Sequence, residues 1–122
     1  MDMAIRAREV TVRDLPERLT DERGRSFFSE LKGEMETDNP YIVLDCSKVC
    51  QIDIPAIYLL LCCLEEAMKR NGDVKLASMP FETTALLELT GVARLFDRYD
   101  TNAEAISSFR RLPAEAFAQG AA

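Results

Sequence analysis

The sequence contains no histidine and no tryptophan, and it has only five glycines among its 122 residues. Histidine is the most frequent general acid or base in enzymes and a frequent metal ligand, so its absence excludes the commonest catalytic and metal sites. Neither a glycine-rich phosphate loop nor a G-x-S-x-G nucleophile motif occurs in the chain. We therefore expect a protein that is not an enzyme, with no catalytic residue, no cofactor and no metal.

Cysteine occurs at four positions, but not in a pattern that is typical of metal binding. Cys46 and Cys50 have C-x3-C spacing, whereas a zinc site needs a second pair or histidines that the chain does not have. Cys62 and Cys63 are adjacent, so on a helix they point about 100° apart. We interpret all four as small apolar packing residues, with Cys50 or Cys46 the best candidate if any thiol is a nucleophile.

Positive charge is also scarce, since 15 lysines and arginines together face 21 acidic residues and leave a net charge of −6. Phosphate backbones repel such a chain and no basic cluster offsets this, so we expect no nucleic-acid binding. The longest apolar run, residues 54–64 with Pro55 inside it, is about half a membrane span, so we expect no membrane insertion. The N-terminal residues MDMAIRAREV lack an apolar signal core, which favours a cytoplasmic location.

Strand-like and helix-like segments alternate along the chain. Apolar runs and alternating patterns predict strands at 8–15, 41–45 and 74–78, with shorter segments at 17–19 and 95–100. Helical periodicity and end signals predict helices at 20–36, 54–70, 80–90 and 101–112. This order predicts one α/β domain at 1–111, with a mixed β-sheet of about four to five strands and helices packed on it. Residues 112–122 are interpreted as a C-terminal tail.

The helix predicted at 54–70 begins with an acidic residue followed by isoleucine and proline. Asp53 is placed to cap the helix, and Pro55 is tolerated in the first turn because its missing N–H needs no partner there. Spacings of three and four residues predict a face toward the sheet, made of Ile57, Leu60, Leu61, Leu64, Ala67 and Met68.

Leu59 and Cys62 fall on the opposite side of this helix, with Tyr58 at the border. Charged residues occur on that side only in the later turns, so the first two turns present an apolar outer surface. A contiguous exposed apolar patch marks a partner site. Burial under a neighbouring loop or another copy of the chain explains the pattern equally well, and both interpretations stay open at this point.

Four stretches of the chain resemble one known family in their order and spacing. They are ERLTDERGRSFFSEL at 17–31, YIVLDCSKVCQIDIPAIYLLL at 41–61, NGDVKLASMP at 71–80 and LLELTGVARLF at 86–96. Together they resemble the STAS domain, the family named for sulfate transporters and anti-sigma factor antagonists, over roughly residues 8–110. Glu17 stands where a glycine is usual. The resemblance implies a STAS-like arrangement of the predicted strands and helices.

The resemblance also implies a function, with one departure from the family pattern. In the family, a Ser or Thr after the Asp is phosphorylated by a partner kinase, and the matching positions here are Ile54 and Pro55. No phosphorylation is therefore expected at that position. The family implies a bacterial, protein-binding regulator of transcription that docks on an anti-sigma factor or serine kinase-like protein through residues 47–62. The implied partner-binding residues are Ser47, Asp53, Ile54, Pro55, Tyr58, Leu59 and Cys62.

Other roles within the same family remain open. The chain also fits a STAS subunit of an ABC-type transporter system, or a component of a stress-signalling scaffold. A homodimer is a further alternative, because an apolar helix rim can be self-complementary. The acidic charge does not discriminate among these roles, but co-purification with a membrane-bound ATPase would indicate the transporter.

Overall fold

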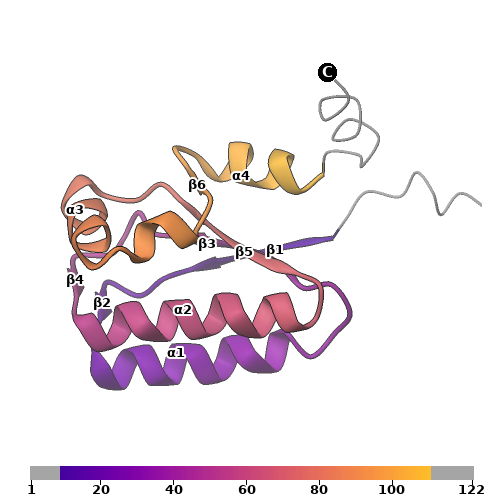
Figure 1. Cartoon of the computed structure of the whole chain (residues 1–122), viewed down its shortest axis with the longest axis horizontal. Coiled ribbons are helices and arrows are strands. Elements are labelled where there is room, and N and C mark those ends of the chain that lie inside the picture. Colours follow the sequence, from indigo (N-terminus) through magenta and orange to yellow (C-terminus); the bar gives the residue numbers. More distant parts are fainter. Residues whose placement is uncertain (1–8, 111–122) are drawn as a thin grey trace, which may run out of the picture.

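The computed structural model describes residues 9–110, except for the side chain of Asp21. A four-stranded sheet lies at the centre in the order β1-β3-β5-β6 (Figure 1). Its strands are β1 (Val10–Asp14), β3 (Tyr41–Asp45), β5 (Asp73–Ala77) and β6 (Arg98–Tyr99). A small second sheet pairs β2 (Arg18–Leu19) with β4 (Gln51–Ile52). The helices are α1 (Asp21–Glu34), α2 (Ile54–Lys69), α3 (Phe81–Thr90), the 3-10 helix η2 (Val92–Leu95) and α4 (Asn102–Phe109).

The predicted α/β class with a sheet of four strands is confirmed. One detail differs, because the strand pairs in residues 9–110 are parallel throughout, whereas the prediction was a mixed sheet. Each connection between neighbouring strands of the main sheet contains a helix, which returns the chain to the same edge before the next strand begins. The predicted tail at 112–122, and the end of the last predicted helix beyond 110, lie outside the described residues.

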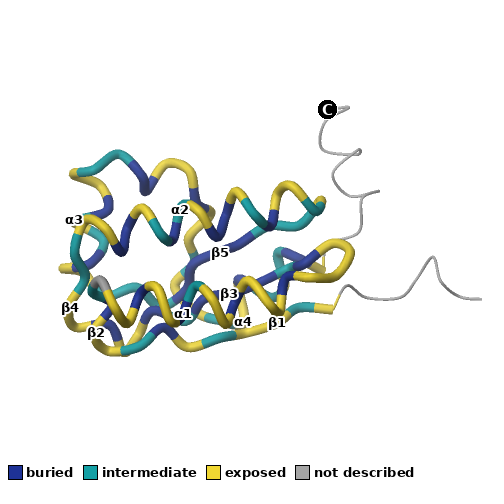
Figure 2. The backbone as a smooth tube through the Cα atoms, turned by 90° about the horizontal axis from the view of Figure 1, so that it is seen from below, coloured by how far each residue is buried: buried dark blue, intermediate teal, exposed yellow. Residues whose placement is uncertain are grey.

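One face of the sheet is covered by α1 and α2, which lie side by side beneath it (Figure 1). Alternate strand residues point into this layer because successive side chains of a strand face opposite sides. Leu44 and Leu76 are fully buried there and belong to the same apolar cluster as Leu31 of α1 and Ile57 of α2. The central strands β3 and β5 are mostly buried along their length (Figure 2).

Within residues 9–110, the other face of the sheet is covered by α4. Its apolar cluster consists of Val43, Ala77, Ala105 and Phe109. Val10 of the edge strand β1 packs against this cluster, whereas Val12, two residues further along the same strand, is 39% exposed.

The turn before β5 shows why glycine is needed at position 72. A Cβ atom at Gly72 would lie 1.9 Å from the carbonyl oxygen of Pro40, which no side chain tolerates. Backbone hydrogen bonds hold the two turns together, from Asn39 N–H to the Arg70 carbonyl at 3.0 Å and from Asp73 N–H to the Pro40 carbonyl at 2.9 Å. The predicted stop of the long helix at 71–73 therefore also anchors the start of β3.

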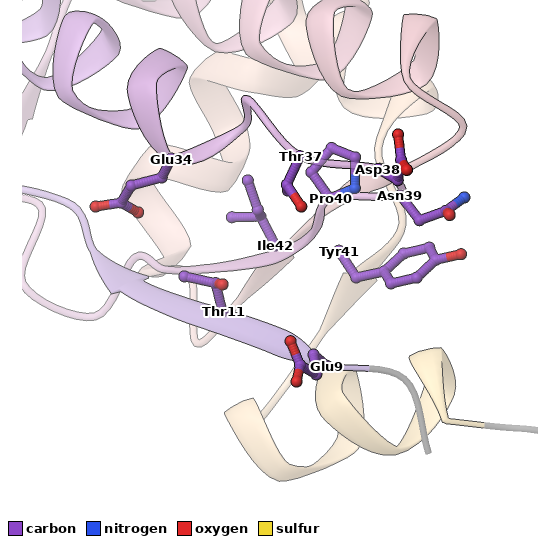
Figure 3. A pocket seen from close by; sticks show the side chains of 9 residues that line it. All are labelled: Glu9, Thr11, Glu34, Thr37, Asp38, Asn39, Pro40, Tyr41 and Ile42. Carbon is purple, nitrogen blue, oxygen red and sulfur yellow. The ribbon is translucent and has the colours of Figure 1, made fainter. Parts of the chain in front are cut away.

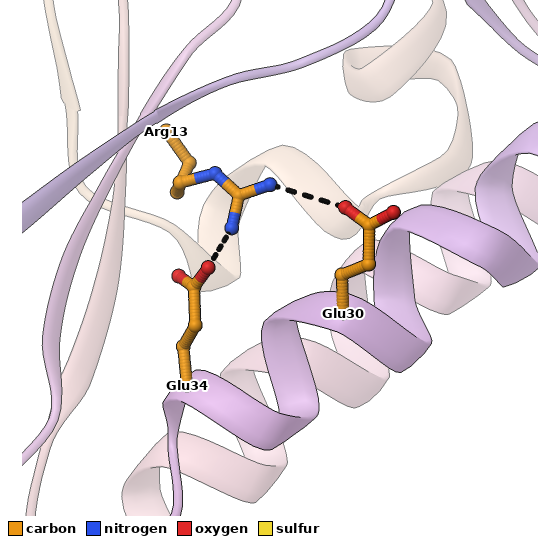
Figure 4. A network of polar contacts seen from close by, with 3 residues as sticks. All are labelled: Arg13, Glu30 and Glu34. Carbon is orange, nitrogen blue, oxygen red and sulfur yellow. Dashed lines mark hydrogen bonds and ion pairs between the residues drawn. The ribbon is translucent and has the colours of Figure 1, made fainter.

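The edge strand β1 is tied to α1 by a charged network (Figure 4). The Arg13 guanidinium donates to the carboxylates of Glu30, at 3.3 Å, and Glu34. Its central carbon lies 5.5 Å from the centre of the Phe27 ring, so the cation also stacks on an aromatic face. These contacts hold β1, one of the two edge strands of the main sheet, against α1.

Candidate protein-docking site

The start of α2 is built around Asp53, which follows β4 directly. Its backbone is extended, with φ −117° and ψ 173°, and its carboxylate accepts a hydrogen bond from the Ala56 N–H at 3.0 Å. The next intrahelical bond runs from Ile57 N–H to the Asp53 carbonyl at 3.1 Å. Pro55 sits in the first turn, where a missing N–H leaves nothing unsatisfied. The predicted N-cap is confirmed, and it makes the beginning of this helix rigid.

Four residues on one side of this helix start are exposed: Ile54, Pro55, Tyr58 and Cys62, together called the α2 rim below. Ile54 is 50% exposed and Tyr58 is 58% exposed, although both are large and apolar in their bodies. At about 100° per residue the four fall within a narrow arc of the helix surface. No residue of the described range therefore covers the α2 rim, which belongs to the outer surface predicted for this helix.

Leu59 occupies a different place from the α2 rim. It is only partly exposed, and its δ1 methyl group would lie 3.1 Å from a Cβ atom built on Gly24 of α1. The absence of a side chain at Gly24 lets the two helices approach at this point. Leu59 therefore contributes to the contact between α1 and α2 instead of standing on the outer side of the helix.

The buried face of α2 is turned toward α1 by the same contact. The buried residues include four that were predicted, Ile57, Leu60, Leu64 and Ala67, together with Ala56 and Cys63, which were not. The prediction for Met68 is wrong, since that side chain is 58% exposed. The periodicity alone placed the centre of the face toward Met68 and Leu61, whereas packing against both the sheet and α1 moves it toward Ala56 and Cys63.

Ser47 lies at the beginning of the loop that leads to β4, beside the carboxyl ends of the strands. Its backbone N–H donates to one carboxylate oxygen of Asp45 at 2.9 Å, and the Asn102 amide donates to the other, also at 2.9 Å. Burial opposes ionisation of Asp45, but these hydrogen bonds and the nearby charge of Lys48 outweigh it and lower its pKa. Ser47 is exposed, yet it is fixed to Asp45 and not to the helix start.

A depression of about 450 Å³ lies next to the α2 start, between β4 and α3. Its lining comprises Thr20, Cys50, Gln51, Ile52, Glu82, Thr83 and Leu86. The sequence pattern did not indicate that α3 borders the candidate site. The sequence did contain one signal, because the apolar residues Phe81, Ala85 and Leu89 recur every four residues. All three are exposed in the structure.

The two buried cysteines are poor nucleophiles. Burial raises the pKa of Cys46 and of Cys63 to about 12, so neither thiol ionises near neutral pH. Cys50 and Cys62 are exposed free thiols, so the interpretation of all four cysteines as packing residues is wrong for these two. Within residues 9–110, no group of three or more Cys, Asp or Glu side chains is arranged to hold a metal ion.

A second depression, of about 460 Å³, lies at the opposite end of the sheet, beside the amino ends of β1 and β3 (Figure 3). Three of its lining residues are acidic, Glu9, Glu34 and Asp38, and none is basic. Glu34 is already bonded to Arg13. Among the helices of the described range, none is long and apolar enough to cross a membrane.

Solved structures of several proteins share this fold. A STAS-domain anti-sigma-factor antagonist from Planctomyces limnophilus aligns at a TM-score of 0.77 and 22% identity, covering 88% of this chain and 98% of that one. A putative anti-sigma factor antagonist from Thermotoga maritima aligns at a TM-score of 0.71 and 25% identity, covering 84% of this chain and 88% of that one. The STAS domain of a SulP transporter from Vibrio cholerae aligns at a TM-score of 0.67 and 21% identity, covering 83% of this chain and 80% of that one. A search of the curated proteins found no match.

The sequence itself matches a family model over most of its length. The model of the STAS domain covers residues 4–105. This range includes the parallel sheet, the capped start of α2 and the helix that ends at Gly91. The chain therefore belongs to the STAS domain family.

Proposed function

We propose that this STAS domain is a non-enzymatic regulatory module that binds an anti-sigma factor or serine kinase-like protein through its α2 rim. The observation that carries the proposal is the exposure of Ile54 and Tyr58 on a capped, rigid helix start. A rigid surface loses little conformational freedom on binding, so exposed apolar side chains there contribute more of their burial energy to affinity. Asp53, Pro55 and Cys62 form the polar and small parts of the same region, and Leu59 packs beneath it against α1. Ser47 is proposed as a separate contact at the carboxyl ends of the strands.

Binding through the α2 rim is proposed to occur without a phosphorylation switch. Ile54 and Pro55 occupy the positions where the family pattern has hydroxyl residues, and neither side chain accepts a phosphoryl group. Thr83 and Thr84 of α3 do not replace them: the Thr84 hydroxyl donates to the Pro80 carbonyl at 3.2 Å and Thr83 is buried, so both have structural roles. Control of the interaction is then a property of the partner, or the module competes for the partner constitutively.

The experiment that tests the proposal compares two variants of one helix. Tyr58→Asp places a charge in the α2 rim, whereas Met68→Asp places the same charge at an equally exposed position outside it, since both residues are 58% exposed. Each tagged protein is used to capture partners from a host lysate that includes detergent-solubilised membranes. The proposal predicts an anti-sigma factor or kinase that binds wild type and Met68→Asp and is lost with Tyr58→Asp.

The same capture separates the alternative role in an ABC-type transporter system. The Vibrio cholerae neighbour shows that this fold also occurs as the STAS domain of a transporter. A transporter ATPase or permease that depends on Tyr58 would replace the regulatory proposal with the transporter role. Equal capture of every partner by both variants would remove the α2 rim from either account.

A further inference from the structure

The helix α3 is apolar on two sides, although only one side packs against the protein. Thr83 and Leu87 are its buried residues, and Leu86 packs partly against the core. The opposite side carries Phe81, Ala85 and Leu89, which are spaced by four residues and so lie along one side of the helix. These three residues are called the α3 stripe below.

The α3 stripe contains the two most exposed large apolar side chains in residues 9–110. Phe81 is 86% exposed and Leu89 is 84% exposed, so neither contributes measurably to the fold. Single exposed apolar residues are ordinary on protein surfaces, but a stripe along three turns of one helix is a contiguous patch. The helix lies at one end of the molecule, where a partner has access to it (Figures 1 and 2).

The charges carried by α3 itself are acidic. Glu82 and Glu88 flank the α3 stripe, both are exposed, and the helix carries no lysine or arginine. The Glu88 carboxylate lies 3.8 Å from the Arg98 guanidinium, which neutralises it in part. Glu82 has no such ion pair with any residue in the described range, and it also lines the depression between β4 and α3.

These charges disfavour two occupants of the stripe. A symmetric antiparallel contact centred on Ala85 would gather two copies of Glu82 along one flank of the interface and two copies of Glu88 along the other, and like charges that face each other across an interface repel. An anionic membrane surface would meet the same two carboxylates and a protein of net charge −6. A protein partner with basic residues meets neither obstacle.

We propose that the α3 stripe is a second docking surface, which binds an amphipathic helix whose apolar side is flanked by Lys or Arg. Residues spaced by four form a ridge that packs into the groove of a facing helix. A basic side chain of that helix reaches Glu82, at the edge of the depression of about 450 Å³. The surface is formed by a different helix from the α2 rim, so this domain binds a second protein there, or a second segment of the same protein.

The test uses two designed peptides of about 18 residues, roughly five helical turns each. Both are stapled helices with the same leucine stripe, flanked by lysines in one and by glutamates in the other. Each is titrated into the full chain while amide chemical shifts are followed by NMR. The proposal predicts that the lysine peptide shifts residues 81–90 and binds about tenfold tighter than the glutamate peptide, with an advantage that shrinks in high salt.

Variants separate this surface from the α2 rim and from general stickiness. Leu89→Ser lies on an exposed position and leaves the core intact, and it is expected to weaken the lysine peptide by about tenfold. Leu95→Ser, at another exposed apolar residue, and Tyr58→Asp are expected to bind as wild type does. Equal affinity for the two peptides, shifts centred elsewhere, or an unchanged Leu89→Ser would overturn the proposal. A dimer in sedimentation that Leu89→Ser dissociates would overturn it in favour of a second copy.

Discussion

The two faces of the main sheet are stabilised by different means. On the side of α1 and α2, the buried apolar cluster contains 21 residues of the described range, whereas the cluster on the side of α4 contains four. The smaller cluster is completed by a lysine, Lys75, which is only 8% exposed. One sheet thus has a hydrophobic face that holds the fold and a partly polar face that holds a short helix.

Lys75 shows how the polar face works. Its ammonium group donates to the Ser108 hydroxyl of α4 at 2.7 Å and lies 4.4 Å from the centre of the Phe109 ring. The same ammonium group lies 5.5 Å from the centre of the Tyr99 ring and 3.8 Å from the Asp97 carboxylate. A buried ammonium group needs such partners, and α4 supplies two of them, the Ser108 hydroxyl and the Phe109 ring. The helix α4 is therefore attached by a small apolar cluster together with a few directional contacts.

The largest expected effect is on the hydrophobic face. Leu76→Ala should lower the free energy of unfolding by about 3 kcal/mol, because a fully buried leucine leaves a cavity that this packed layer fills only in part. Urea denaturation followed by circular dichroism measures the loss. A change below about 1 kcal/mol would mean that the layer between the sheet and α2 repacks freely.

A smaller and more local effect is expected at Lys75. Lys75→Ala should cost about 1–2 kcal/mol, from the lost hydrogen bond to Ser108 and the lost contact with the Phe109 ring. Hydrogen exchange should accelerate at the amides of α4 while those of α2 keep their protection. Lys75→Met is the matched control, because it keeps the packed stem and removes the ammonium group with its charge and its hydrogen bond to Ser108. Equal acceleration in both helices would contradict a separate attachment of α4.

A smaller loss of stability is expected at the N-cap of α2, on the hydrophobic side of the sheet. Asp53→Ala should destabilise the domain by about 1 kcal/mol, because the Ala56 N–H loses its acceptor. Asp53→Asn keeps an acceptor oxygen and should differ from wild type by only a few tenths of that amount. Thermal denaturation of the three proteins in one buffer measures both differences. A loss in Asp53→Asn as large as in Asp53→Ala would show that charge, not capping, is what matters there.

Local signals explain why much of the fold was predictable from the sequence. The N-cap Thr101 accepts from the Glu104 N–H at 3.1 Å as its pattern indicates, and Gly91 ends α3 with a φ of +80°. Thr20 also stands at an N-cap, although its side chain makes no capping hydrogen bond. Such signals act within a few residues, so they need no knowledge of the packing partner.

The remaining features depend on contacts between distant segments. The rotation of α2 follows from the close approach of Leu59 to Gly24, which no periodicity within α2 reveals. The α3 stripe was missed because α3 is apolar on both sides, and a pattern of that kind does not say which side is buried. The position of the α2 rim could be predicted from the start of the helix. The packing of Leu59 against α1, which separates it from the α2 rim, could not be predicted.

The smallest expected effect is a pH dependence that belongs to the polar face alone. Burial raises the pKa of Asp73 above its ordinary value of 3.8, although a hydrogen bond from Val74 N–H offsets part of this. The charged form of Asp73 therefore destabilises the native state at neutral pH. This destabilisation is relieved as the pH falls through the raised pKa and the carboxylate takes up a proton. Asp45 has the opposite sign: its lowered pKa stabilises the fold above pH 3.8, and that contribution is lost as pH falls below it.

Acid titration of the free energy of unfolding should therefore show a small rise just above pH 3.8, followed by a fall below it. Asp73→Asn should abolish the rise, and Asp45→Asn should flatten the fall, because an amide does not titrate. Leu76→Ala should lower the whole curve without changing its shape, since the hydrophobic face carries neither carboxylate. A change of shape in Leu76→Ala would mean that the two faces are coupled, and that α4 responds to packing on the far side of the sheet.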